Sequence, residues 1–152
     1  MSRIIAVANQ KGGVGKTTTA VNLAACLAAA EKRTLLVDMD PQANATSGFG
    51  LDRKADRPTI YDFLVSDAPF EQVVIRAVVP WLDMIPSGVN LAGAQVELLQ
   101  LESREQRLRR ALASVIAPLM LSDDQRYEVV LIDCPPSLGL LTVNALVAAR
   151  SV

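Results

Sequence analysis

The sequence predicts an α/β fold: a three-layer α/β/α sandwich built on a mostly parallel sheet. Short apolar runs of strand length alternate along the chain with longer segments of helical pattern. The runs are apolar at nearly every position, which is typical of parallel strands that helices cover on both faces. A glycine-rich loop also joins the first run to the first helical segment. These three observations favour parallel strands whose ends carry the functional groups.

The first half of the chain contains two predicted strands and one long helix. Residues 4–8 form a short apolar run bounded by polar residues, which indicates a buried strand. We expect an alanine-rich helix from about residue 16 to residue 30, and a second buried strand over 34–37 that ends at Asp38. Residues 40–56 are polar and contain glycine, so we expect a loop there rather than a core element.

The second half repeats this alternation with shorter elements. Residues 59–64 and 69–76 have the pattern of short helices, and residues 82–85 that of another strand. A strongly apolar strand is predicted over 129–132, and a further helix over 138–149. The order of these elements extends the parallel sheet that the first half begins.

An amphipathic helix is predicted before the last strand. Ser103 and Gln106 have the spacing of a capping box, and the helix would run towards Leu121. Its apolar face would carry, at helical spacing, Leu108, Leu112, Val115, Ile116 and Leu119. Its basic residues are Arg104, Arg107, Arg109 and Arg110. Because Glu102 and Glu105 offset these arginines, we interpret them as a solvated helix face rather than a surface for DNA.

Length and composition predict a single domain over residues 1–152. Hydrophobic residues make up 51% and charged residues 20%, which excludes a disordered chain. The net charge of −1 gives no basic excess of the kind that indicates nucleic-acid binding. The two cysteines, Cys26 and Cys134, lie in apolar segments without a disulfide or metal pattern. Because the chain has no histidine, its chemistry must use carboxylates, lysines, backbone amides and a hard cation.

The ends of the chain and its hydropathy predict a cytoplasmic protein without a membrane partner. Residues 1–3 run directly into a strand and do not form a signal peptide. The longest apolar stretch, residues 20–30, is interrupted by Asn22 and is too short to span a bilayer. The chain stops at residues 151–152, where the pattern calls for another strand, and we interpret this as truncation.

A phosphate loop is predicted between the first strand and the first helix, over residues 9–18, NQKGGVGKTT. Phosphates need convergent N–H donors and close approach of the backbone, and glycine permits both. The helix that follows adds free amides and a positive dipole end. Lys16 would reach the β- and γ-phosphates, and the Thr17 hydroxyl would ligate Mg²⁺. The strict pattern fails at Gln10, where a glycine is expected, but the setting favours this interpretation over a simple glycine-rich turn.

Three aspartates follow predicted strands: Asp38, Asp40 and Asp133. In an open parallel sheet, ligands bind beyond the carboxyl ends of the strands. Carboxylates at such ends suit a hard cation, which they hold directly or through its waters. A single aspartate of this kind is more often a cap of a loop or helix. Three of them beside a phosphate loop favour a metal and nucleotide site. Cys134, next to Asp133, is interpreted as a buried structural thiol rather than a redox group.

The loop sequence KGGVGKTT, with its additional Lys11, resembles the deviant Walker A motif of the ParA/MinD superfamily of P-loop NTPases. The resemblance implies that ATP contacts the residues of this motif: Lys11, Gly12, Gly13, Val14, Gly15, Lys16, Thr17 and Thr18. It also implies that Lys11 reaches across a dimer to the partner's nucleotide, as an arginine finger does elsewhere. The alternative for Lys11 is a solvated loop lysine.

Two further segments resemble the same family. VDMDPQANATSGFG is similar to its switch I region, and LIDCPPS to its Walker B and switch II region. The resemblance implies that Asp40 positions the attacking water, while Asp38 and Asp133, with Thr17, serve the Mg²⁺ site. The catalytic residues would then be Lys11, Lys16 and Asp40. Because an ordinary aspartate is a weak base at neutral pH, we expect Asp40 to orient the water rather than abstract a proton.

Within the superfamily, the chain resembles the amino-terminal part of ParA/Soj partition ATPases over essentially its whole length. This implies an ATP-dependent sandwich dimer, non-specific binding of DNA by the full-length protein, a ParB-like partner that stimulates slow hydrolysis, and association with the nucleoid. Three alternatives remain: a nucleotide-binding module or regulator without hydrolysis, a MinD-like positioning ATPase, and a biosynthetic enzyme related to dethiobiotin synthetase.

Overall fold

A mostly parallel five-stranded sheet forms the centre of the fold in the computed structural model, which describes residues 2–117, 122 and 126–152. The strand order is β1-β5-β2-β4-β3, and only the edge strand β3 runs antiparallel to its neighbour. The strands are β1 (Arg3–Val7), β2 (Thr34–Asp38), β3 (Ile75–Val79), β4 (Leu82–Ile85) and β5 (Val129–Asp133). Beyond β1, Ser151 makes a parallel bridge with Ile5.

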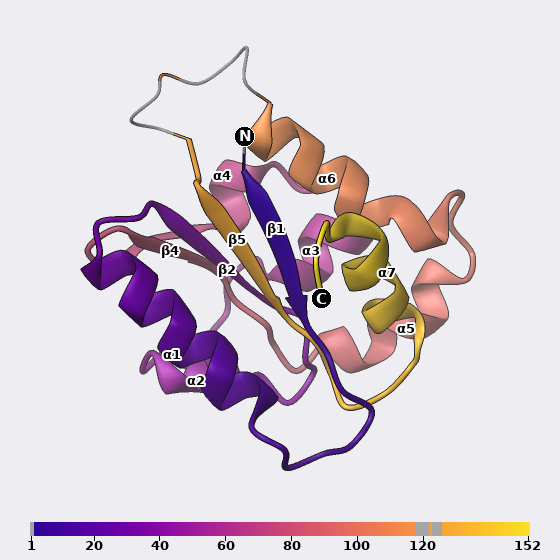
Figure 1. The fold of residues 1–152 in the computed structure, drawn as a ribbon. Helices are drawn as coiled ribbons and strands as arrows, with labels where there is room; N and C mark the ends of the chain where they lie inside the picture. Colours follow the sequence, from indigo (N-terminus) through magenta and orange to yellow (C-terminus); the bar gives the residue numbers. More distant parts are fainter. Residues whose placement is uncertain (1, 118–121, 123–125) are drawn as a thin grey trace.

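Helices cover both faces of the sheet, so the predicted three-layer architecture is confirmed (Figure 1). One face is covered by α1 (Lys16–Ala29) and α2 (Asn44–Gly48). The helices of the other face are α3 (Ile60–Val65), α5 (Leu91–Leu98), α6 (Arg107–Ile116) and α7 (Leu140–Ala148). The short α4 (Phe70–Val73) leads into β3, and a 3₁₀ turn, η1 (Arg104–Gln106), leads into α6.

The central strands divide their side chains between two apolar cores. In β2, Leu35 and Val37 pack on the side of α3, α5, α6 and α7, whereas Leu36 packs on the side of α1. This alternation follows from the two-residue period of a strand, and it explains why the strand is apolar at every position. On α1, three alanines spaced by four residues face the sheet: Ala20, Ala24 and Ala28. Their small side chains let this helix lie close to the strands.

The strand register places the carboxyl ends of β1, β2 and β5 side by side. In the parallel pairing of β2 with β5, Asp38 lies opposite Asp133. In the pairing of β1 with β5, Val7 lies opposite the same Asp133. The loop that follows β1 therefore starts beside both aspartates, although more than 90 residues separate Asp38 from Asp133 in the chain.

Two predicted elements differ in the structure. Residues 40–56 are not only a loop, because they contain α2, whose Ala45 and Thr46 are buried. The helix predicted over 69–76 ends at Val73, and the chain then enters β3. The helix α5 was not predicted. For α2, the bond from the Ser87 N–H to Thr46, 41 residues away, contributes to a structure that the local pattern does not reveal.

The capping box predicted at Ser103 is wrong. Ser103 has a left-handed backbone with φ of 52° and no side-chain cap, and its carbonyl accepts a bond from the Gln106 N–H. The helix α6 begins only at Arg107 and ends at Ile116; Leu119 and Leu121 lie outside the described residues. A capping box occurs instead at the start of α3, between Thr59 and Asp62.

A cluster of polar side chains holds β3, the antiparallel strand at the edge of the sheet opposite β1. Asp83 on β4 accepts bonds from the Ala77 N–H at 2.8 Å, from Arg76 at 2.9 Å and from the Tyr127 hydroxyl at 2.5 Å. Burial alone would raise the pKa of Asp83, but these bonds outweigh it and hold the pKa below its ordinary value of 3.8. Arg33 lies over the Tyr127 ring, 5.4 Å from its centroid.

Candidate nucleotide-binding site

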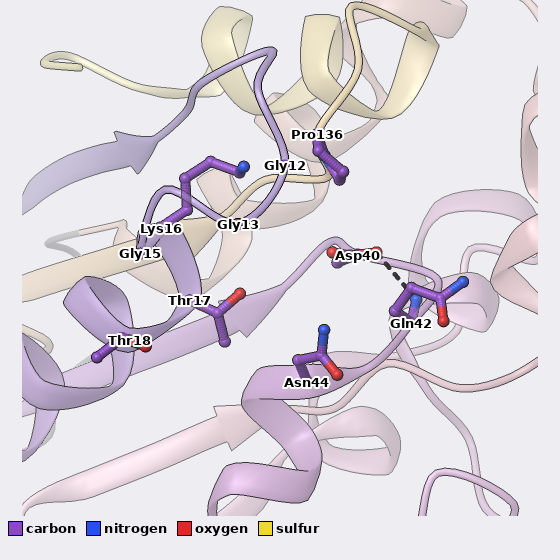
Figure 2. Close-up of a pocket in the computed structure, with 10 residues that line it drawn as sticks. All are labelled: Gly12, Gly13, Gly15, Lys16, Thr17, Thr18, Asp40, Gln42, Asn44 and Pro136. Atoms are coloured by element: carbon purple, nitrogen blue, oxygen red, sulfur yellow. Dashed lines mark hydrogen bonds between the residues drawn. The ribbon is translucent and has the colours of Figure 1, made fainter.

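A cavity of about 250 Å³ opens at the carboxyl edge of the sheet (Figure 2). Most of the residues that line it were predicted for the site: Gly12, Gly13, Gly15, Lys16, Thr17, Thr18 and Asp40. Three more line it that the sequence reasoning missed: Gln42, Asn44 and Pro136. All three lie in the segments similar to switch I and switch II, so a residue-by-residue reading of those segments could have found them.

The loop before α1 has the geometry that phosphate binding requires. Gly13 and Gly15 have φ of 70° and 92°, a left-handed region in which a side chain would be strained. Gly15 is the N-cap of the 14-residue helix α1, and no side chain caps this end. The free amides and the positive end of the helix dipole are therefore available to an anion.

The two lysines of the loop take different places. Lys16 lies on the first turn of α1, and its Nζ donates to the carbonyl of Lys11 at 2.9 Å. Lys16 lines the cavity, whereas Lys11 and Val14 are exposed and do not line it. The structure thus brings Lys16 to the site of its own chain and leaves the Lys11 side chain outside that cavity.

Asp133 and Thr17 form the part of the site that is suited to a cation. The Thr17 hydroxyl donates to Asp133 Oδ2 at 2.8 Å. Asp133 is fully buried, and its Oδ1 has no hydrogen-bond partner among the described residues. Burial raises the pKa of Asp133 to about 6, the Thr17 bond opposes this rise, and the charge of Asp40 adds to it. A buried carboxylate oxygen without a partner, next to a hydroxyl, fits a magnesium ion.

The donor set also fits magnesium rather than a transition metal. Within residues 2–117, 122 and 126–152, no group of three or more His, Cys, Asp or Glu side chains could hold a metal by itself. Mg²⁺ does not need such a cage, because it is usually bound by one or two carboxylates together with phosphate oxygens and water. The site is therefore one that a metal and a nucleotide would complete together.

Asp40 lies at the cavity, across from the phosphate loop (Figure 2). Its Oδ1 accepts a bond from the Gln42 N–H at 2.9 Å, which fixes the carboxylate on the loop. Only 6% of Asp40 is exposed. A carboxylate held in this position faces the space that the phosphate loop leaves open, where a water molecule could be oriented.

Asp38, predicted for the magnesium site, ends β2. It is fully buried and does not line the cavity. Its Oδ1 accepts from the Asp40 N–H at 3.1 Å, and its Oδ2 accepts from Thr46 N and Oγ1 at 2.9 and 2.7 Å. Burial raises its pKa to about 7, and these hydrogen bonds limit the rise. Both oxygens of Asp38 thus bind the protein itself, and a role at the magnesium stays a prediction.

Both cysteines are free thiols and form no disulfide. Cys134 is buried, and burial raises its thiol pKa to about 12, while Cys26 on α1 is exposed. The predicted burial of the Cys134 thiol is confirmed. No helix in the described part of the chain is long and apolar enough to cross a membrane.

Comparison with protein families decides the identity of this arrangement. The family AAA_31, an AAA domain, matches residues 2–152. The chain belongs to this family of ParA/Soj partitioning ATPases. It is 54% identical to the sporulation initiation inhibitor protein Soj of Bacillus subtilis and 52% identical to the chromosome partitioning protein ParA of Myxococcus xanthus. Both matches include all 152 residues, which correspond to 57% and 51% of those proteins, so the chain spans about half their length.

Solved structures give the same fold. A cobyrinic acid a,c-diamide synthase of Mycobacterium smegmatis, with a bound ATP analogue and magnesium, matches with a TM-score of 0.88 and 40% identity. A plasmid partition protein of Borrelia burgdorferi matches with a TM-score of 0.83 and 31% identity. The first match covers 99% of this chain and 58% of the synthase chain. The second covers 98% of this chain and 63% of the partition protein chain. The P-loop fold predicted for this ParA/Soj-type chain is therefore confirmed.

Proposed function

We propose that this ParA/Soj-type chain binds Mg-ATP and hydrolyses it slowly, in a cycle that segregates DNA. The observation that carries the proposal is that the phosphate loop, Thr17 and Asp40 line one cavity, and that Thr17 is hydrogen-bonded to the buried Asp133. Phosphoryl transfer depends mainly on positioning and on electrostatic stabilisation, and these groups supply both.

The phosphate loop and Lys16 bind the triphosphate in this proposal. The backbone amides of residues 12–18 donate to phosphate oxygens, and Lys16 exchanges its bond with the Lys11 carbonyl for the β- and γ-phosphates. Thr17 and Asp133 hold the magnesium ion, with Asp38 beside them at the end of the neighbouring strand. When bound, the ion would neutralise part of the negative charge on the phosphate oxygens.

Asp40 orients the water that attacks the γ-phosphate. Its carboxylate is fixed by the Gln42 N–H and lies across the cavity from Lys16 and Thr17. The exposed Lys11 acts in trans on the nucleotide of a second copy, so that ATP holds a sandwich dimer together. Relatives named for chromosome partitioning support a cytoplasmic, nucleoid-associated cycle with non-specific DNA and a ParB-like partner.

Three alternatives predict different behaviour. A regulator without hydrolysis would bind ATP and dimerise but release no phosphate. A MinD-like positioning ATPase would hydrolyse ATP with a partner that does not bind centromeres. The similarity to a cobyrinic acid a,c-diamide synthase makes a biosynthetic enzyme a third alternative, which would release phosphate only with a carboxylated metabolite.

The test compares wild type with Asp40→Ala, both in the full length that the gene encodes. Size exclusion with light scattering, run with ATP, with ADP and without nucleotide, gives the oligomeric state, and phosphate release gives the turnover. We expect Asp40→Ala to bind ATP, form a dimer only with ATP, and release no phosphate. The matched control is Asp52→Ala, because Asp52 is an exposed loop aspartate away from the cavity. Normal turnover of Asp40→Ala, or a monomer under all three conditions, would contradict the proposal.

A further inference from the structure

Thr46 on α2 connects two distant segments of the chain. Its hydroxyl donates to Asp38 Oδ2 at 2.7 Å and accepts from the Ser87 N–H at 2.9 Å. Its own N–H donates to the same Asp38 oxygen at 2.9 Å. Asp38 ends β2, and Ser87 follows β4, so one hydroxyl joins the ends of two neighbouring strands to α2.

The same cluster holds the backbone of Asp40 from both sides. The Asp40 N–H donates to Asp38 Oδ1 at 3.1 Å, and the Asp40 carbonyl accepts from the Ser87 hydroxyl at 2.7 Å. Asp38, Thr46 and Ser87 are at most 2% exposed. Water therefore cannot replace a lost partner at low cost, and each bond of the cluster constrains the peptide that carries the Asp40 carboxylate.

We propose that Thr46 and Ser87 are positioning residues for hydrolysis: Thr46 fixes the Asp40 backbone through Asp38, and Ser87 fixes it directly through the Asp40 carbonyl. This inference rests on the proposed ATPase function. Neither Thr46 nor Ser87 lines the cavity, so they act on the reaction only through the loop that carries Asp40. Among the described residues, the hydrogen bonds of the Thr46 and Ser87 side chains go to Asp38, Ser87 and Asp40 and not to the phosphate loop, so we expect these residues to affect hydrolysis without changing nucleotide affinity.

The variants distinguish the effect of losing a hydroxyl on kcat from the effect of changing the side-chain volume. Thr46→Val removes the hydroxyl at nearly constant volume, Thr46→Ser retains it, and Ser87→Ala removes only the bond to the Asp40 carbonyl. A misplacement of about 1 Å can reduce a rate about 100-fold, so we expect Thr46→Val to lower kcat by about 10- to 100-fold. We expect Ser87→Ala to lower kcat in the same direction and Thr46→Ser to stay near wild type.

The matched control is Thr34→Val. Thr34 is also a fully buried threonine, and its hydroxyl donates to the Lys32 carbonyl at 2.8 Å, at the opposite end of β2. This variant loses a comparable hydrogen bond, so it controls for lost stability, and we expect an unchanged kcat. Steady-state hydrolysis at saturating Mg-ATP gives kcat in the full-length protein. Equilibrium binding of ADP with Mg²⁺ gives the affinity, which we expect to stay within about twofold.

Each outcome decides the inference. A lower kcat with unchanged ADP affinity in Thr46→Val, restored in Thr46→Ser and absent in Thr34→Val, supports it. Wild-type kcat in Thr46→Val, or a parallel loss of kcat and ADP affinity, overturns it. If Thr46→Val does not fold, Ser87→Ala decides, and an unchanged kcat in that variant overturns the inference. A wild-type protein without hydrolysis overturns the proposed function and this inference with it, whereas equal hydrolysis by wild type and variants overturns the inference alone.

Discussion

Replacing the buried Asp133 by asparagine should stabilise the nucleotide-free protein at pH 8. Asp133 is fully buried, one of its oxygens has no partner in the described structure, and its pKa is raised from 3.8 to about 6. A carboxyl with a raised pKa stabilises the fold fully below pH 3.8, and this contribution is lost as the pH rises through about 6. At pH 8 the wild type therefore bears the full cost of an ionised, buried carboxylate.

The size of this cost follows from the pKa. Each tenfold change in ionisation corresponds to about 1.4 kcal/mol, so the rise from 3.8 to about 6 corresponds to about 3 kcal/mol. Asparagine has no charge, but its buried amide group needs a partner, and an unpaired one costs about 1–2 kcal/mol. We expect Asp133→Asn to raise the free energy of unfolding by about 1–2 kcal/mol at pH 8. The charge of Asp133 also raises the pKa of Asp38. Removing that charge makes ionised Asp38 less costly, which also favours a more stable variant at pH 8.

The assay is urea unfolding of wild type and variant without nucleotide, with a chelator, at pH 8 and at pH 5. All other carboxylates are common to both proteins, so the difference in free energy of unfolding reports position 133 together with its coupling to Asp38. We expect this difference to fall by about 1–2 kcal/mol between pH 8 and pH 5, because folded wild type takes up a proton at Asp133. With Mg-ADP at pH 8, we expect wild type to be more stable than Asp133→Asn, because binding stabilises wild type more than a variant without the carboxylate. A variant less stable than wild type at pH 8, or a difference that does not change with pH, would refute the reasoning.

Two further predictions concern the site and the sheet edge. Lys16→Ala should lower ATP affinity at least about 100-fold while the urea midpoint stays near wild type, because within the described residues the Lys16 ammonium donates one hydrogen bond, to the Lys11 carbonyl. Isothermal titration calorimetry with Mg-ATP measures the affinity, and unchanged binding would contradict the role. Tyr127→Phe should lower the free energy of unfolding by about 1–3 kcal/mol in urea, because the hydroxyl bonds both Asp83 and Arg76. An unchanged midpoint would mean that this hydroxyl does not hold β3.

The phosphate loop and the strand ends could be predicted from the sequence because their signals are local. A glycine-rich stretch that ends in Lys16 and Thr17, between an apolar strand and an alanine-rich helix, has few structural solutions. An apolar strand followed by Asp38 or Asp133 fixes which end of the sheet carries the carboxylates, since parallel strands end at the same edge. The architecture and the main cavity residues followed from these short patterns.

Two elements that were missed, α2 and β3, depend on side-chain hydrogen bonds that the hydrophobic pattern does not show. The helix α2 is held by the bonds from Thr46 to Asp38 and from Ser87 to Thr46, the second of which joins residues 41 positions apart. The strand β3 forms because Asp83 binds Ala77 and Arg76, while the local sequence has the pattern of a helix. Ser87 lies outside any window of residues around Thr46, whereas Asp83 is only six residues from Ala77. Propensity and periodicity take account of neither side-chain bond, so they alone gave a loop and a helix there.

By itself, the sequence determined the fold class, the phosphate loop, and the strand ends at which carboxylates gather, because spacing within ten residues is enough to specify each of them. Only the tertiary structure decided what surrounds each of those carboxylates. Asp133 is buried beside Thr17 with one oxygen that has no partner among the described residues, Asp40 lines the cavity, and Asp38 accepts a bond from the Asp40 backbone. The physical reason is that a carboxylate in a buried site must find hydrogen-bond partners, and those partners are brought to it by strands distant in the chain.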